Sequence, residues 1–216
     1  MPIQLRKILQ LLKHPSLTRF TCAMGIQGYL KDIGWINSYL LKMPVDNKNK
    51  PLPWVTYPFI DFIEDRLDTT MKVFEYGSGN STLWYADRVA VVIAVEHDKF
   101  WYDKVLNTMP DNVTLNYQEI DKSGIYAEFA KNLNISFDIV IVDGRERIDC
   151  IKNAVDAIHS SGIIILDDSE RDKYRKGIDF LKKEGFKQLD LWGIAPAVFF
   201  KKCTTVFYRS DNILGL

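Results

Sequence analysis

The sequence predicts an α/β protein with a doubly wound, mostly parallel sheet that ends in an antiparallel pair of strands. From residue 71 onward, short runs of β-branched residues alternate with stretches whose apolar residues recur at helical spacing, which is typical of βαβ units. The last two apolar runs are joined too closely for a parallel crossover, which takes a dozen or more residues and usually a helix. A chain of 216 residues, 47% of them hydrophobic, can bury roughly 70% of its unfolded surface in such a fold.

The apolar runs place the strands along the chain. We expect parallel strands at 72–76, 91–96, 113–118, 137–142 and 162–167, and the antiparallel pair at 186–192 and 204–209. Helical spacing supports the helices between them, as in the sets Ile151, Ala154, Val155, Ile158 and Tyr174, Ile178, Leu181.

The residues before this region predict a helical extension and a linker at 1–70, followed by the α/β domain at 71–216. Two apolar sets recur at helical spacing, Leu5, Ile8, Leu9, Leu12 and Tyr29, Ile33, Ile36, Leu40. A polar, proline-rich linker at 43–53 separates them from a further helix marked by Ile60, Ile63 and Leu67. Three roles for the extension stay open: a lid over a cleft, a surface for another subunit, or a cover for one side of the sheet.

Charge and cysteine usage narrow the class of protein. The 28 basic and 28 acidic residues cancel, so there is none of the basic excess that binding to a phosphate backbone needs. Cys22, Cys150 and Cys203 lie far apart, which predicts reduced core residues and no zinc site. Charges and Gln10 interrupt the N-terminal apolar run, and no run approaches the ~20 apolar residues of a membrane span. We expect a cytoplasmic protein that neither spans a membrane nor binds nucleic acid.

The run Glu75-Tyr76-Gly77-Ser78-Gly79-Asn80-Ser81 carries the strongest functional signal. It leads from a strand through a glycine turn into a helix, where glycines let the backbone approach a ligand closely and the helix start offers free N–H groups. Taken alone, Gly77 and Gly79 admit any nucleotide-like ligand, and an ordinary βα loop is the alternative.

Two acidic residues restrict the kind of ligand that this turn can bind. Thr82 occupies the position of a third dinucleotide-fingerprint glycine, and Glu75 precedes the first glycine by two residues. A carboxylate there favours the ammonium and sulfonium of S-adenosylmethionine and repels a pyrophosphate. Glu96 ends the second strand, where an acid can accept both ribose hydroxyls; the alternative is that Glu96, His97 and Asp98 cap the next helix.

These residues, together with Phe137–Gly144 and the terminal strand pair, resemble class I S-adenosylmethionine-dependent methyltransferases over about residues 70–210. The resemblance implies a Rossmann-like, seven-stranded sheet in which only the last inserted strand is antiparallel. Within that superfamily the chain looks most like bacterial small-molecule or sugar O-methyltransferases. The resemblance implies cofactor binding by these residues: Glu75, Gly77, Ser78, Gly79, Asn80, Ser81, Glu96, His97 and Asp143.

Asp143, Asp167 and Asp168 follow the fourth and fifth strands, where ligands bind in such sheets. Three converging carboxylates repel unless a positive group lies between them. The pattern is similar to metal-dependent O-methyltransferases of the catechol type, which implies a Mg²⁺ site at these three residues. Asp143 is the expected catalytic residue, by itself or with the metal. The alternatives are an Asp-Gly turn at Asp143, a helix cap at Asp168 or Ser169, and pairing of the acids with Arg145, Arg147 and Arg171.

The expected reaction is in-line transfer of the sulfonium methyl to an oxygen of a small molecule or sugar. Trp54, Thr56 and Tyr57 are either a pocket wall or ordinary packing, and Gly193–Ala197 is expected to line the acceptor pocket. Two rival functions stay open: a nicotinamide-dependent oxidoreductase, which Glu75 and Thr82 disfavour, and a non-catalytic S-adenosylmethionine-binding protein. The acceptor is not identified, and a homo-oligomer is compatible with the sequence.

Overall fold

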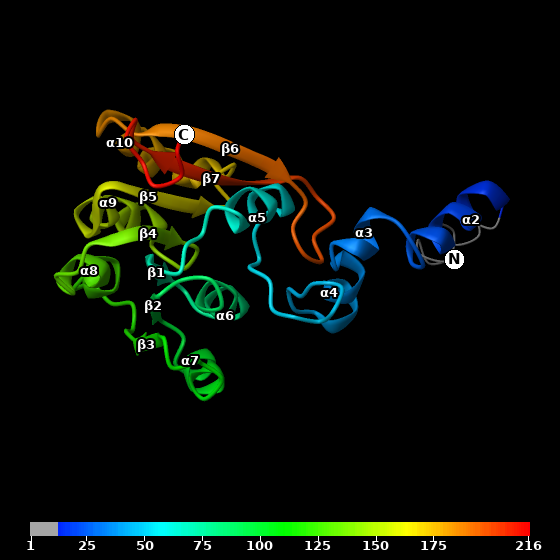
Figure 1. Cartoon of the computed structure of the whole chain (residues 1–216), viewed down its shortest axis with the longest axis horizontal. Coiled ribbons are helices and arrows are strands. Elements are labelled where there is room, and N and C mark those ends of the chain that lie inside the picture. The colour runs from blue at the N-terminus through cyan, green and yellow to red at the C-terminus, as the bar shows by residue number, and fades with distance from the viewer. Residues whose placement is uncertain (1–12) are drawn as a thin grey trace.

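The computed structural model of the chain describes residues 13–216 (Figure 1). The first predicted apolar set, Leu5 to Leu12, lies outside these residues.

A seven-stranded sheet forms the centre of the molecule, in the order β3-β2-β1-β4-β5-β7-β6. Strands β1 to β5 are mutually parallel, β7 runs antiparallel to β5, and β6 runs antiparallel to β7. The strands are β1 Lys72–Tyr76, β2 Val91–Glu96, β3 Val113–Tyr117, β4 Phe137–Val142, β5 Ile158–Asp167, β6 Lys187–Gly193 and β7 Lys202–Tyr208. The predicted Rossmann-like sheet with its antiparallel last pair is confirmed.

Helices cover both faces of the sheet (Figure 1). They are α5 Tyr57–Glu64, α6 Asn80–Ala86, α7 Lys99–Leu106, α8 Ile125–Asn132, α9 Arg147–Ala157 and α10 Arg175–Lys183, with a short 3₁₀ turn, η1 Asp172–Tyr174, before α10. One core forms between the sheet and α8, α9 and α10, and a second forms between the opposite face and α5 and α6. Alternate residues of each central strand face opposite cores, as a two-residue period requires.

The fifth strand begins earlier than predicted. Ile158 was expected at the end of a helix, but α9 ends at Ala157 and Ile158 opens β5, where it pairs with Phe137. The register then shifts before Ile139. Ile158 is buried in either arrangement, so its helical spacing could not separate the two.

The N-terminal region divides into two parts. Helices α2 Pro15–Met24 and α3 Tyr29–Asp32 bury no residue completely and stand away from the sheet (Figure 1). Helix α4 Trp35–Leu41 buries Trp35 and Ser38, and Trp35 joins the core beneath α5. Leu30 and Ile33 are partly buried against the same core, so the packing of the extension on the α/β domain begins at Leu30.

The structure tests the predicted burial of the cysteines and the predicted absence of a membrane span. Cys150 and Cys203 are buried, but Cys22 is exposed, so the prediction that it is a core residue was wrong. Within residues 13–216 the helices are too short or too polar to cross a membrane.

Candidate functional site

The glycine turn leaves the carboxyl end of β1 in a conformation that suits glycine. Gly77 has φ 108° and Gly79 has φ 151°, a region in which a side chain is strained. The Gly77 N–H donates to the carbonyl of Val95 at 2.9 Å, which ties the turn to β2.

Glu75 holds this turn from beneath. Its side chain is buried, and its carboxylate accepts hydrogen bonds from Ser81 Oγ and, at 2.6 Å, from Thr82 Oγ1. Thr82 Oγ1 in turn accepts the Gly79 N–H at 3.0 Å. Burial raises the pKa of Glu75 to about 7, against the hydrogen bonds that favour its ionised form. Glu75 is thus placed under the loop and not on its open surface.

Glu96 lies at the carboxyl end of β2, beside the turn. Its Oε1 accepts the backbone N–H groups of His97 and Asp98, each at 2.8 Å, and its Oε2 accepts the Ser78 hydroxyl at 3.0 Å. The helix cap is Asp98 instead, whose carboxylate accepts the Trp101 N–H at 2.9 Å. The carboxylate of Glu96 is therefore not the cap of α7. His97 Nδ1 lies 2.8 Å from Glu96 Oε1.

A cavity of about 180 Å³, here called the loop cavity, opens above the turn. Its walls are the turn residues Ser78, Gly79, Asn80 and Ser81, with Trp101, Asp143 and four residues of the N-terminal extension, Lys42, Met43, Pro44 and Trp54. Asn80 Nδ2 donates to the Pro44 carbonyl at 2.7 Å. The linker of the extension therefore closes one side of this cavity.

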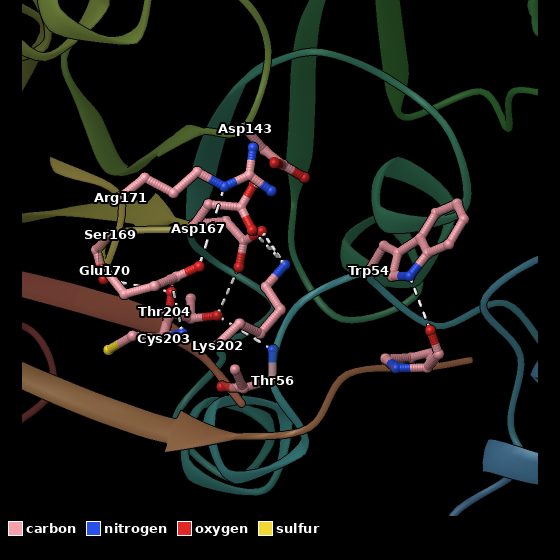
Figure 2. Close-up of polar contacts among 12 residues, drawn as sticks. Trp54, Thr56, Asp143, Asp167, Ser169, Glu170, Arg171, Lys202, Cys203 and Thr204 are labelled. Atoms are coloured by element: carbon pink, nitrogen blue, oxygen red, sulfur yellow. Dashed lines mark hydrogen bonds and ion pairs between the residues drawn. The ribbon is translucent and has the colours of Figure 1, made fainter. Parts of the chain in front are cut away.

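Lys202 lies between the two acids that end β5. Its Nζ is 2.6 Å from Asp167 Oδ2 (Figure 2). The same Nζ is 2.9 Å from Asp168 Oδ1. Thr204 Oγ1 donates to the remaining Asp167 oxygen at 2.7 Å. Burial disfavours the charged ammonium, but the two carboxylates outweigh it and raise the pKa of Lys202. The lysine therefore stays cationic.

Arg147 completes the pairing of the acids. Its guanidinium is 2.8 Å from Asp143 Oδ1 and 3.6 Å from Asp168 Oδ2, and it donates to the backbone carbonyls of Asp143, Gly144 and Asp167. Arg171 lies 2.8 Å from Asp168 Oδ2. Three cations thus hold the three acids together.

This arrangement corrects the expected metal site. Asp143, Asp167 and Asp168 do converge, but the positive groups between them are Lys202 and Arg147, and both Asp167 oxygens already have donors. Among residues 13–216 there is no group of three His, Cys, Asp or Glu placed to hold a metal ion. The donors do not fit Mg²⁺, and the pairing of the acids with arginine is the alternative that the structure supports.

Asp143 has the environment of a proton acceptor. Its side chain keeps 27% of its surface exposed. Burial, followed by the negative charge of Asp167, raises its pKa to about 8, and Arg147 and Lys202 only partly oppose this. Burial also raises the pKa of Asp167.

A second cavity, of about 270 Å³ and here called the acid cavity, lies over these groups. Its lining residues are Trp54, Asp143, Asp167, Asp168, Arg171, Val198, Phe200 and Lys202. Trp54 stands across from the charged cluster and donates from Nε1 to the Pro196 carbonyl at 2.8 Å (Figure 2). Trp54 and Asp143 line both cavities, so the two cavities adjoin.

Several residues that were considered for the wall of the pocket lie away from the two cavities. Trp54 lines the cavities, whereas Thr56 and Tyr57 are buried, and the Thr56 N–H donates to Thr204 Oγ1 at 3.1 Å. No residue of 193–197 lines the loop cavity or the acid cavity; Val198 and Phe200, just beyond this segment, line the acid cavity. Asp168 has φ 54° and caps no helix, since η1 and α10 begin after Arg171 and Tyr174.

Sequence reasoning missed Lys202. It follows Lys201, and such a pair ordinarily lies on a solvated surface. The alternation of side chains along β7 indicates its position. Thr204 pairs with Asp167, and Lys202 lies two residues earlier, so Lys202 is on the same face of the sheet as Thr204.

The fold is found among solved structures. Precorrin-6y C5,15-methyltransferase from Geobacter metallireducens superposes with a TM-score of 0.54 and 17% identity, over 71% of this chain and 87% of that one. Precorrin 8w decarboxylase from Methanobacterium thermoautotrophicum gives 0.53 and 19%, over 77% and 96%. An rRNA methylase from Streptococcus thermophilus gives 0.50 and 15%, over 69% and 92%.

The chain has the Rossmann-like fold that these structures share. At these identities the likeness is one of fold, and the neighbours act on different substrates. No family model matches the sequence, and no curated protein matches it.

Proposed function

We propose that this protein is an S-adenosylmethionine-dependent methyltransferase that methylates a hydroxyl of a small molecule or sugar. The observation that carries the proposal is the adjacency of the two cavities, because Asp143 and Trp54 line both the loop cavity and the acid cavity. A methyl donor above the glycine turn and an acceptor over the acids would meet at these residues, as in-line transfer requires.

The residues that line the loop cavity, and Glu96 buried behind Ser78, suit this cofactor. The Glu96 carboxylate, at a strand end beside the glycine turn, can accept ribose hydroxyls once Ser78 Oγ gives up its place on Oε2. Trp101 lies over the turn: its Nε1 donates to the Ser78 carbonyl at 2.9 Å, and its Cζ2 would lie 3.6 Å from a Cβ added to the buried Gly79. When bound, S-adenosylmethionine supplies an electrophilic methyl group on a sulfonium whose departure needs no protonation.

Asp143 is the residue assigned to deprotonation. It borders both cavities, and its pKa of about 8 makes it a stronger base than an ordinary carboxylate. It would take the hydroxyl proton as the acceptor oxygen bonds to the methyl carbon and the sulfur–carbon bond breaks. Lys202 stays protonated and serves as a positioning residue, because it holds Asp167 and Asp168 beside Asp143 without repulsion.

Calorimetric titration tests the proposal. We expect S-adenosylmethionine to bind the wild type and to bind Glu96→Gln roughly 10- to 100-fold more weakly, since a hydrogen bond to a charged acceptor contributes about 1.5–3 kcal/mol. Glu128→Gln, at a partly exposed position of α8 that does not line the loop cavity, is the matched control and should bind normally. Heat with NAD and none with S-adenosylmethionine would favour an oxidoreductase and overturn the proposal.

Catalysis needs its own measurement. Incubation with a panel of hydroxyl compounds, followed by mass spectrometry, should reveal a methylated product. Binding of the cofactor without methylation of any compound would support a non-catalytic binding protein and contradict the catalytic assignment.

A further inference from the structure

A third hollow, here called the outer groove, continues outward from the two cavities. It measures about 460 Å³ and is lined by Tyr39, Leu40, Lys42, Trp54 and Ala197, between α4 and the β6–β7 connection. Trp54 lines all three hollows. A molecule whose one end lies beside Asp143 can therefore extend past this indole into the outer groove.

Apolar side chains line this path, here called the rim: Tyr39, Leu40, Met43, Trp54 and Phe200. Phe199 contacts Tyr39 next to the rim. Leu40, Phe199 and Phe200 are 71%, 72% and 62% exposed. Single exposed apolar residues are ordinary, but a group of them around a cavity mouth marks a binding surface. Lys42 is the one charged residue among the five that line the outer groove.

Tyr39 and the β6–β7 connection beside it are held in place before any ligand binds. Trp35 Nε1 donates to the Val198 carbonyl at 3.0 Å, and the Trp35 ring meets Phe199 edge-on with centroids 4.7 Å apart. Tyr39 contacts Phe199 in the same way, at 5.3 Å. These contacts fix the β6–β7 connection against α4, so little ordering of the chain opposes binding.

Two residues of the outer groove have a left-handed backbone conformation, which costs conformational free energy. Lys42 has φ 56° and Ala197 has φ 59°, left-handed values that non-glycine residues rarely adopt. Such conformations concentrate at ligand sites. Both of these residues line the outer groove.

We infer that the acceptor is an amphiphile, with its hydroxyl-bearing polar head in the acid cavity and its apolar tail in the outer groove. The inference rests on the proposed function and narrows its substrate class. The acid cavity offers paired charges and a proton acceptor, which suit a polar head. The outer groove offers apolar walls, which a sugar without a tail would leave exposed to water.

Alkyl β-glucosides of increasing chain length, kept below their micellar concentrations, are the probes. In calorimetric titrations of the wild type we expect affinity to rise about two- to fourfold for each added methylene. Leu40→Asp should weaken octyl glucoside binding at least fivefold and leave methyl glucoside binding unchanged. Phe100→Ser is the matched control, because Phe100 is 79% exposed on α7, lines none of the three hollows, and should leave both affinities unchanged.

Equal affinity for all chain lengths would overturn the inference. So would a wild-type dimer in light scattering that Leu40→Asp dissociates, because a second copy would then cover the rim. S-adenosylmethionine binding with methylation of glucose and no tail preference would refute the inference alone. Chain-length dependence without S-adenosylmethionine binding would refute the proposed function and leave the groove as an apolar-chain site.

Discussion

Lys202 Nζ lies 2.6 Å from Asp167 Oδ2, and this ion pair is almost completely enclosed, with 7% and 2% of the two side chains exposed. A buried ammonium thus occupies the place where the sequence predicted a divalent cation. Because each charge lacks water, each depends on the other for its stability.

Removing the ammonium should therefore destabilise the protein. We expect Lys202→Met to lower the free energy of unfolding by about 3–5 kcal/mol, because Asp167 and Asp168 keep buried charges without their shared partner. Urea denaturation measures the loss. Lys201→Met, at the exposed neighbouring position, is the control and should change stability little.

The same variant tests what the acids can bind. Terbium luminescence should be absent from the wild type and should appear in Lys202→Met, where carboxylates lacking the lysine can ligate a hard cation. Terbium binding to the wild type at equal affinity would contradict the assignment of Lys202 as the resident cation.

Asp143 should make stability depend on pH. A carboxyl with a folded pKa of about 8 and an ordinary unfolded pKa binds more protons in the folded state between roughly pH 4 and 8. Stability contributed by this group is therefore present at low pH and is lost as the pH rises through 8. Between pH 5 and pH 8 the melting temperature of the wild type should therefore fall relative to that of Asp143→Asn.

Thr114→Val, at an exposed strand position, removes no titratable group and should show no such trend. A difference between wild type and Asp143→Asn that does not change with pH would show that Asp143 titrates normally. In activity assays, the rate should rise with pH through the same interval, since only the ionised carboxylate accepts a proton.

Gly144 should not tolerate a side chain. A Cβ there would lie 2.2 Å from Tyr126 Oη and 3.1 Å from the backbone of Tyr76. We expect Gly144→Ala to cost about 1–3 kcal/mol in urea denaturation. Adding Tyr126→Phe should restore part of that loss by removing the hydroxyl. Gly25→Ala, whose nearest contact is an ordinary 3.6 Å, should be close to neutral.

Thr82 should matter to the turn without lining the loop cavity. Its hydroxyl donates to Glu75 and accepts the Gly79 N–H. We expect Thr82→Val to lower the free energy of unfolding by about 2 kcal/mol, because two buried groups lose a partner. Thr114→Val, at an exposed strand position, provides the comparison. Equal stability of the two variants would show that the Glu75 network does not hold the turn.

The parts of the fold that could be predicted depend on short stretches of sequence. The strands through β4 and the glycine turn depend on short patterns, and the structure places them where expected. Glu75 is instead buried beneath the turn, where Ser81 and Thr82 occupy its carboxylate. The start of β5 was wrong because Ile158 is buried as helix or as strand.

The candidate site depended on information that short patterns lack. Whether Asp167 faces a metal or a lysine is decided by the pairing of β5 with β7, which brings Lys202 from 35 residues away. Trp54 reaches the site from the extension, and its position depends on a hydrogen bond to Pro196, 142 residues further along the chain.

The shared wall at Trp54 has a thermodynamic consequence. Its indole is 45% exposed and borders the loop cavity, the acid cavity and the outer groove. A ligand that fixes this ring in one hollow lowers the entropic cost of binding in the next. Donor and acceptor should then bind with positive heterotropic cooperativity, and the factor by which each tightens the other must be the same in both directions.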